Sequence, residues 1–206
     1  LESIVVGDTL HENGRRISDV YFPNGGVFSI TNRMPDGPLV EVATVGREGM
    51  LGIGVFLGDR SGNGRTFQQV ADGPVAALGV ARFIRETANS GAFREVMALY
   101  AQASLLQVMQ CTACNALHDV TRRCCRWLLQ THDRVDADDF LLKQEFLAVM
   151  LGVRRPTVTV VLRALQEAGL ISSRYGRMRV LRRKRLEAAS CECYGAIRDQ
   201  FVRLGL

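Results

Sequence analysis

The chain has 206 residues, of which 47% are hydrophobic and 23% are charged. These values are typical of a globular protein with one or two domains, and they exclude a disordered chain, a collagen and a small disulfide scaffold. The net charge of +5 is unevenly placed, because residues 1–140 carry 13 basic and 16 acidic side chains whereas residues 141–206 carry 13 and 5. This asymmetry predicts a second domain that faces a polyanion, with nucleic acid as the first candidate.

The first part of the chain has the pattern of strands and turns. Between Ile4 and Val80, short apolar runs are separated by Gly, Asn, Asp and Pro at a spacing of roughly ten residues. The clearest runs are residues 20–22, 27–30 and 40–45. The pattern predicts an antiparallel sandwich or barrel, and the seven glycines between Gly46 and Gly64 mark a glycine-rich loop within it.

Residues 92–151 contain neither Gly nor Pro, and a seam of mainly apolar residues recurs there at alternating steps of three and four. The seam consists of Val96, Leu99, Ala103, Leu106, Gln110, Ala113, Leu117, Val120, Cys124 and Trp127. Such a seam predicts one long helix over residues 91–133 that joins two copies in a homodimer. The polar Gln110 suits a dimer that must fix its register. A helix buried within its own chain is the alternative.

The segment from Val96 to Leu117 has no charged residue and is about long enough to span a bilayer. Polar side chains such as Gln102, Gln107 and Asn115 occur on nearly every turn, however. We therefore expect no membrane partner. The first ten residues lack the basic start of a secretion signal, so we expect a cytoplasmic protein.

Six cysteines are present, and reduced thiols are expected in the cytoplasm. Cys111 and Cys114 have the spacing of a zinc pair, but they fall inside the predicted long helix and no second Cys/His pair follows at a matching distance. We expect packing thiols here and at Cys191 and Cys193, with no metal and no cofactor. A redox or metal sensor that uses Cys111 and Cys114 stays open.

Residues 144–165 predict two short helices joined near Gly152. Pro156 suits the first turn of the second helix, where a missing N–H costs nothing. The apolar residues of that helix, which face a core, are Val158, Val161, Leu162 and Leu165. Its opposite face is basic and carries hydroxyl groups, so the pair predicts a helix-turn-helix whose second helix enters the major groove of double-stranded DNA.

The next segment, residues 171–181, predicts a hairpin that turns at Tyr175 and Gly176. Arginines alternate along it and would follow a DNA backbone. The sequence thus predicts a winged helix-turn-helix over residues 134–206.

Each candidate DNA-binding residue has a predicted role. Arg155, at the start of the second helix, is placed to bind guanine O6 and N7. Thr157 and Thr159 are candidates for phosphate or thymine methyl contacts. The phosphate candidates, which set the salt dependence, are Lys143, Arg154, Arg163, Arg174 and Arg177.

The order of a β-rich domain, a long helix and a winged helix resembles the CRP/FNR superfamily of bacterial transcription regulators. The residues that carry the resemblance are 46–52, 119–121 with 128–129, and 151–158. The resemblance covers nearly the whole chain, and it implies an α+β protein with a cyclic-nucleotide-binding-like antiparallel β-roll over residues 1–90. It also implies that about thirty residues precede this start in similar proteins.

The resemblance also marks candidate effector residues, and several depart from the cyclic-AMP pattern. Met50, after Gly49, replaces the Glu that holds the ribose, and Val108 and Met109 replace small hydroxyl residues on the helix. Arg60 or Arg65 would take the place of the phosphate-binding Arg. A thioether cannot accept a ribose O–H as a carboxylate does. We therefore expect an unidentified small-molecule effector, if any, and not cyclic AMP.

Two other classes of function compete with this one. A ligand- or metal-binding β-roll protein, or a small enzyme, would leave the basic domain without a role. The first eighty residues contain only His11 among histidines, and no nucleophile–base pair or phosphate-binding loop occurs. We expect a regulator that is not an enzyme.

Overall fold

The computed structural model describes residues 2–33, 39–62, 65–68, 73–135 and 137–205. Its strands are β1 (Glu2–Ile4), β2 (Thr9–His11), β3 (Asp19–Pro23), β4 (Phe28–Arg33), β5 (Leu39–Val45), β6 (Arg65–Gln68), β7 (Gly73–Gly79), β8 (Asp139–Leu141), β9 (Ile171–Arg174) and β10 (Arg177–Val180). Its α-helices are α1 (Val80–Asn89), α2 (Gly91–Leu117), α3 (Val120–His132), α4 (Gln144–Leu151), α5 (Arg155–Glu167), α6 (Arg183–Ala189) and α7 (Cys193–Arg203), and a 3-10 helix spans Ile53–Val55.

The first seven strands form the predicted antiparallel β-roll. One sheet has the order β1-β7-β3 and the other has the order β2-β6-β4-β5, with every pair antiparallel. Apolar side chains from both sheets, including Phe28, Val45 and Val75, are buried between them. The predicted strand runs coincide with β3, β4 and β5, so the fold class expected for this part is confirmed.

The predicted single helix through Trp127 is wrong, because the chain breaks between α2 and α3. His118 has an extended backbone, and the carboxylate of Asp119 accepts a hydrogen bond of 3.0 Å from the backbone N–H of Arg122, in the first turn of α3. Helix α3 is buried on all sides from Cys124 to Thr131, and its apolar residues continue the apolar pattern of α2 across the break. A side-chain cap of this kind starts a new helix without any Gly or Pro.

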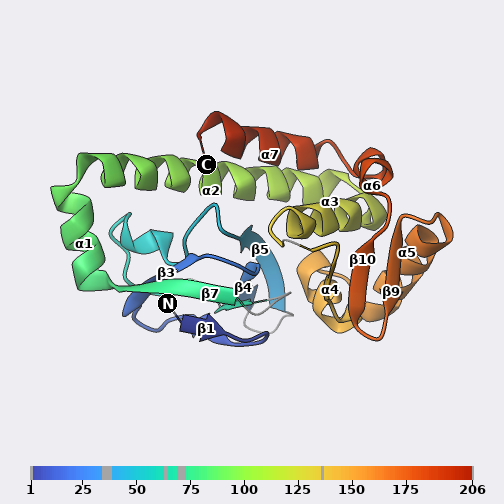
Figure 1. Ribbon diagram of the computed structural model, residues 1–206, viewed down its shortest axis with the longest axis horizontal. Coiled ribbons are helices and arrows are strands. Elements are labelled where there is room, and N and C mark those ends of the chain that lie inside the picture. Colours follow the sequence, from blue (N-terminus) through green and yellow to red (C-terminus); the bar gives the residue numbers. More distant parts are fainter. Residues whose placement is uncertain (1, 34–38, 63–64, 69–72, 136, 206) are drawn as a thin grey trace.

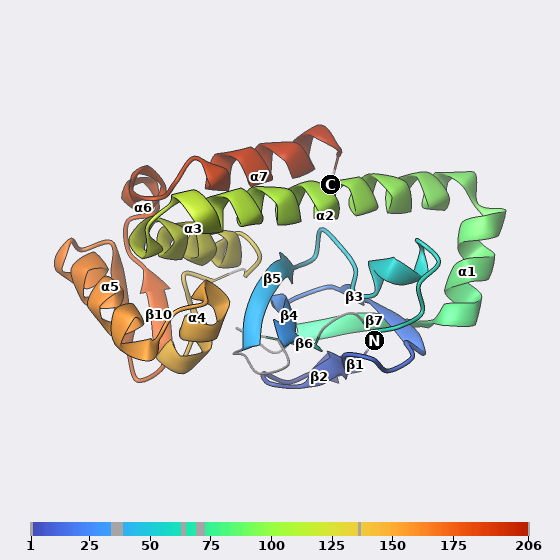
Figure 2. The same cartoon turned by 180° about the vertical axis from the view of Figure 1, so that it is seen from behind.

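The predicted seam does not form one partner-facing surface, because part of it is buried within the chain itself. Ala103, Cys124 and Trp127 are buried in the chain's own core, which corrects their assignment to a partner-facing seam. In both Figure 1 and Figure 2, α7 lies alongside α2, and Ile197 and Phe201 of α7 belong to the same buried cluster as Ala103. One long side of α2 is therefore covered by the chain itself.

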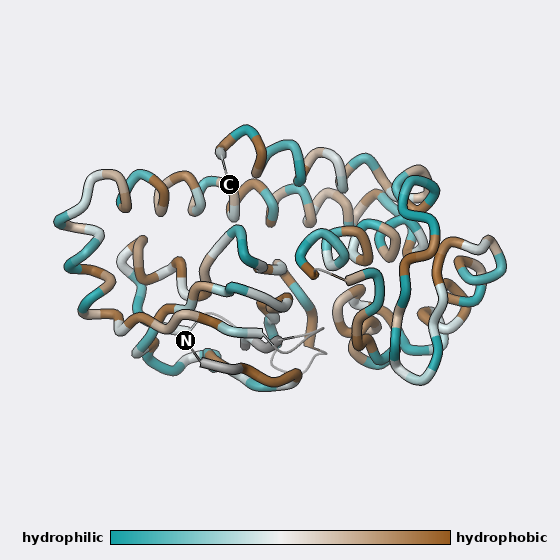
Figure 3. The backbone as a smooth tube through the Cα atoms, in the orientation of Figure 1, coloured by the Kyte–Doolittle hydropathy of each residue, from teal (hydrophilic) through white to brown (hydrophobic). Residues whose placement is uncertain are grey.

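A different stripe of α2 is exposed. Leu105 is 61% exposed and Met109 is 58% exposed, and Val108 beside them is also exposed. Figure 3 shows that hydrophobic and hydrophilic residues alternate along the whole of α2. None of the helices in the described part of the chain is both long and apolar enough to cross a bilayer.

The winged helix-turn-helix has the predicted form. Gly152 ends α4 with φ 62° and ψ 37°, a left-handed conformation that glycine adopts without strain. The wing is a three-stranded sheet of order β8-β10-β9. Its turn places Tyr175 at φ 49° and Gly176 at φ 75°, which closes the hairpin at the expected residues.

Candidate nucleic-acid interface

Helix α5 presents one face to the core and the other to solvent. Its four apolar residues predicted to be internal are all buried: Val158, Val161, Leu162 and Leu165. Arg155, Thr157, Val160 and Arg163 are exposed on the remaining surface. The exposed face therefore carries two guanidinium groups, a hydroxyl and an apolar side chain, the chemistry needed to contact phosphates and base edges.

Arg155 is not free of partners. Its Nε lies 2.9 Å from Oε1 of Glu145 in α4, and the two side chains are 64% and 62% exposed. An ion pair this exposed contributes little stability, typically below about 1 kcal/mol. The guanidinium can therefore exchange Glu145 for a DNA group at small cost.

Thr159 has a local partner that the sequence did not predict. Its hydroxyl donates to Oε1 of Gln144 at 2.8 Å and lies 3.2 Å from the carbonyl of Arg155. This contact joins the start of α4 to α5 and leaves Thr159 half-buried. Thr157, by contrast, is exposed at the beginning of α5.

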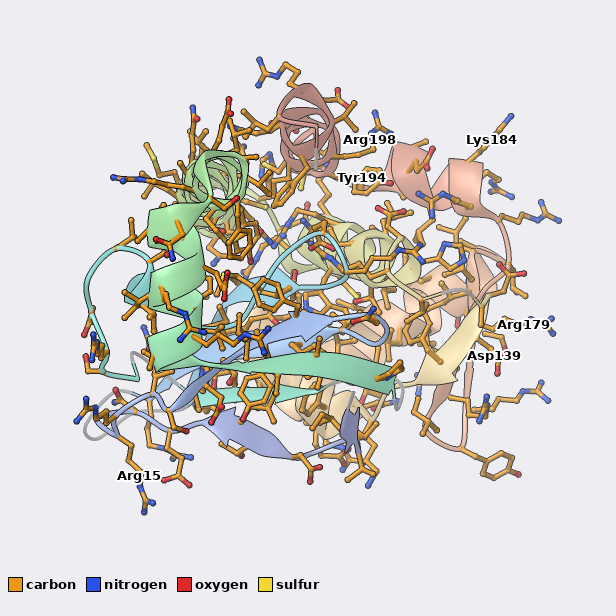
Figure 4. All side chains as sticks on the ribbon, turned by 60° about the vertical axis from the view of Figure 1, so that its left-hand side comes forward. Arg15, Asp139, Arg179, Lys184, Tyr194 and Arg198 are labelled. Atoms are coloured by element: carbon orange, nitrogen blue, oxygen red, sulfur yellow. The ribbon has the colours of Figure 1, made fainter. Side chains whose placement is uncertain are left out.

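Four of the predicted phosphate contacts are exposed cations with no ion pair among the described residues: Lys143, Arg154, Arg163 and Arg174. Arg177 differs, because its Nε donates to Oδ2 of Asp139 at 3.0 Å across β8 and β10. This hydrogen bond lowers the pKa of the Asp139 carboxyl. In Figure 4, Arg179 of the central strand β10 lies beside Asp139, its register partner on β8, so it extends the basic surface of the wing.

A hollow of about 360 Å³ lies between the helix pair and the wing. It is lined by Lys143 and Gln144 at the start of α4, by Arg155, and by Ser173 and Tyr175 of the wing. Tyr175 is fully exposed. From the sequence Tyr175 was predicted only as a turn residue, although an aromatic ring at a hairpin tip is itself a signal of a contact surface.

The structure does not bring the six candidate effector residues together. Gly49 and Met50 lie against Tyr100 of α2, whose hydroxyl donates to the Met50 carbonyl at 3.0 Å. Burial raises the pKa of Tyr100 to about 12. Val108 and Met109 lie on the exposed stripe of the same helix.

Of the two candidate arginines, Arg60 is also apart from that contact. Arg60 lines a separate opening of about 510 Å³ beside α1. Arg65 begins β6, and its side chain lies outside the described part of the structure. The space between β5 and α2, next to Thr44 and Gln107, measures only about 10 Å³, which is room for one water at most.

Another opening of about 510 Å³ lies where the β-roll, α3 and α7 meet. Its lining includes Arg47 and Glu48 after β5, Arg134 after α3, and Tyr194 and Arg198 of α7. The guanidinium carbon of Arg198 lies 5.5 Å from the centre of the Tyr194 ring, and Figure 4 shows both side chains on α7. A small molecule bound here would touch the β-roll and the DNA-binding part at once.

Known proteins share both the helix-turn-helix domain and the overall architecture of this chain. Residues 122–189 match the model of the Crp-like helix-turn-helix domain. A CRP-family transcriptional regulator from Thermus thermophilus superimposes with a TM-score of 0.77 at 18% identity, covering 92% of this chain and 96% of its own. FixK2 from Bradyrhizobium japonicum superimposes with a TM-score of 0.78 at 15% identity, and it too covers 92% of this chain and 96% of its own.

A second protein from Thermus thermophilus, a transcriptional regulator of the CRP/FNR family, gives a TM-score of 0.71 at 18% identity and covers 92% of this chain and 97% of its own. No curated protein matches the chain in sequence. At these identities the likeness concerns the fold. The chain therefore combines a Crp-like helix-turn-helix domain with the overall fold of the CRP/FNR regulators.

Proposed function

We propose that the protein is a sequence-specific, DNA-binding transcription regulator that acts as a homodimer. The observation that carries the proposal is the exposed face of α5, which follows the Gly152 turn and carries Arg155 and Arg163, together with the exposed arginines of the wing. Arg155 reads a base, and Lys143, Arg154 and Arg174 hold phosphates. The protein acts in the cytoplasm and performs no catalysis.

A second copy of the chain is the occupant we assign to the exposed stripe of α2. Leu105, Val108 and Met109 lie on one side of the helix, while α7 and the β-roll cover other sides. Burying such side chains stabilises an assembly by about 1.5–3 kcal/mol each. Two reading helices related by a two-fold axis then meet half-sites about one helical turn of DNA apart.

The effector, where one acts, is not cyclic AMP. The place of the ribose-binding carboxylate is taken by the buried thioether of Met50, and its carbonyl is occupied by the Tyr100 hydroxyl. Titration calorimetry with cyclic AMP is expected to show no binding in the micromolar range or tighter. Binding at that strength would contradict this part of the proposal.

Selection of bound sequences from random DNA tests the main proposal. We expect a two-fold symmetric motif with half-site centres about 10 base pairs apart. Enrichment of no sequence, with equal binding to all DNA, would contradict sequence-specific recognition. An enriched single half-site would contradict the dimer and leave base recognition intact.

A further inference from the structure

Four metal-ligating side chains gather where the end of α2 meets the start of α7: Cys114, His118, Cys191 and Cys193. Their candidate ligand atoms all lie within 4.8 Å of one another. The three cysteines are buried, and the His118 side chain is only 13% exposed. Cys114 lies in the last turn of α2, and His118 is the residue that follows the end of this helix.

The spacing of these atoms fits a metal site better than a disulfide. The Sγ atoms of Cys114 and Cys191 are 3.5 Å apart, and Sγ of Cys193 is 3.6 Å from Nδ1 of His118. A tetrahedral zinc ion with Zn–S bonds of about 2.3 Å keeps neighbouring sulfur ligands about 3.8 Å apart. A disulfide needs its sulfur atoms at about 2.05 Å.

The orientation of His118 supplies a second, independent indication. Its Nδ1 faces the thiols, and its Nε2 lies 3.1 Å from Oε1 of Glu192. Histidines that bind metals usually donate their other ring N–H to a carboxylate or carbonyl, which fixes the tautomer and the ring plane. Glu192 stands between Cys191 and Cys193 in the chain, so one short segment provides two ligands and this outer partner.

The charges around the cluster are suited to a bound dication. Three thiolates and a neutral imidazole around a divalent ion carry a net charge of −1. Arg126 is buried nearby, its Nε–H has no acceptor among the described residues, and Nη1 lies 3.5 Å from Sγ of Cys111. Gln110 donates from Nε2 to Sγ of Cys193 at 3.1 Å, as an outer partner of a thiolate would.

We propose that Cys114, His118, Cys191 and Cys193 form a closed, four-coordinate site for a divalent metal ion of the zinc type. The two ligand pairs enclose the whole helix-turn-helix domain between them in the chain, so the ion joins α7 to the end of α2. All four positions are protein ligands, which makes the site structural or regulatory and not catalytic. Binding releases the thiol protons of the cysteines to solvent.

Cobalt titration of the reduced protein under anaerobic conditions tests the site. We expect one equivalent of Co²⁺ to give the visible bands of a tetrahedral ion and a thiolate charge-transfer band, and Zn²⁺ to remove both. Cys193→Ser and His118→Ala lose these bands. Their zinc affinity falls by more than the roughly 10–100-fold that loss of an outer partner such as Glu192 causes.

Two further cysteine variants serve as matched controls. Cys111→Ser and Cys125→Ser each remove a thiol that is not among the four ligands, and both are expected to keep the full cobalt spectrum. A loss in Cys111→Ser equal to that in Cys193→Ser would overturn the ligand set. Because Cys193 is buried, Glu192→Gln on the exposed side offers a variant that keeps the core intact and still weakens binding.

Folded wild-type protein that takes up no Co²⁺ or Zn²⁺, although all six thiols react with a thiol reagent once the protein is unfolded and are therefore reduced, would overturn the proposal. So would a Cys114–Cys191 disulfide in peptide maps of metal-free protein purified without added oxidant. Neither measurement involves DNA, so the metal site can fail while the DNA selection succeeds, and the reverse.

Discussion

Glu48 and Arg134 form a buried ion pair between the β-roll and the segment that follows α3. Nη2 of Arg134 lies 2.7 Å from Oε1 of Glu48, and the two side chains are 18% and 8% exposed for Glu48 and Arg134 respectively. Glu48 also accepts a 3.0 Å hydrogen bond from the backbone N–H of Gly46, and Arg134 donates to the Thr44 hydroxyl at 3.0 Å. Arg134, in the segment between α3 and the helix-turn-helix, is thus held by β5 and by the turn that follows β5.

This pair predicts a loss of stability in acid. Burial by itself would raise the pKa of Glu48, but the charge and hydrogen bonds of Arg134 outweigh it and lower the pKa below the ordinary value of 4.5. A carboxyl with a lowered folded-state pKa stabilises the protein above its unfolded pKa, and this contribution disappears as the pH falls through the folded pKa. Urea unfolding midpoints should therefore decrease as the pH falls below 4.5.

Glu48→Gln tests the assignment. It leaves the Arg134 guanidinium buried without a counter-charge, so we expect a loss of about 3–5 kcal/mol at neutral pH and a weaker dependence on acid. Glu12→Gln removes the exposed partner of Arg15 and should cost below about 1 kcal/mol. Similar losses of stability in the two variants would show that the buried Glu48–Arg134 pair contributes no more than an exposed ion pair.

Arg155 and Arg174 should differ in their effect on DNA binding. Arg155→Ala is expected to cost about 1–3 kcal/mol and to relax the preference at one base position. Arg174→Ala should weaken binding to all sequences and reduce the salt slope by about one. Fluorescence anisotropy with selected and random duplexes at several salt concentrations separates the two effects.

Arg82→Ala is the matched control for these variants. Arg82 lies on α1, which Figure 1 places at the opposite end of the molecule from α5, and it pairs with Glu86 at 3.7 Å. Its removal should leave affinity and specificity unchanged. If Arg155→Ala weakened binding to specific and random DNA equally, Arg155 would not be a base-recognising residue.

Charges on the exposed stripe of α2 should separate the proposed dimer. Leu105→Glu combined with Met109→Glu places four carboxylates in a two-fold interface, so we expect monomers and the loss of half of the operator contacts. Sedimentation at low concentration measures the first effect. Leu57→Glu, at an equally exposed residue of the glycine-rich loop, should remain a dimer. A double variant that stays dimeric would place the interface elsewhere.

Gly49 should tolerate no side chain, because an added Cβ would lie within 2.5 Å of the Tyr100 ring. Gly49→Ala is expected to lower the free energy of unfolding by about 1–3 kcal/mol or more. Gly91→Ala, at the open start of α2, meets no atom within 4 Å and should be neutral or stabilising. In a Tyr100→Leu background the cost of Gly49→Ala should fall, which a double-mutant cycle measures.

The sequence predicted the winged helix well because every local signal agreed there. Gly152 supplies a left-handed helix end, Pro156 fits the first turn of α5, and the hairpin closes at Tyr175 and Gly176. Each of these features depends on a few neighbouring residues, so no tertiary information was needed.

The long helix and the partner-facing seam were predicted less well. Apolar residues that recur at alternating steps of three and four indicate only that one side of a helix is buried. They do not show whether the chain itself or a second copy covers that side. The cap at Asp119 was a readable signal of a new helix, but the continuous apolar pattern concealed it. The cover provided by α7 comes from the far end of the chain.

The cysteine cluster was missed for a similar reason. Cys111 and Cys114 have the expected spacing of a metal pair, yet only Cys114 belongs to the cluster, and Sγ of Cys111 instead accepts a hydrogen bond from Arg126. Of the other members, His118 follows the end of α2, whereas Cys191 and Cys193 lie beyond the whole helix-turn-helix domain in the chain. Only the return of α7 onto α2 brings these residues together.

That return also constrains how the reading helices can move. The DNA-binding part leaves α2 at His118 and Asp119, and it rejoins the same helix through α7, which starts at Cys193. Both connections lie at the same end of α2, where the candidate ligand atoms of Cys114, His118, Cys191 and Cys193 are within 4.8 Å of one another. A change in the presentation of α5 that leaves α7 packed on α2 therefore pivots about this one junction, and it must also alter the contacts of α4 with β5 and of Arg134 with Glu48.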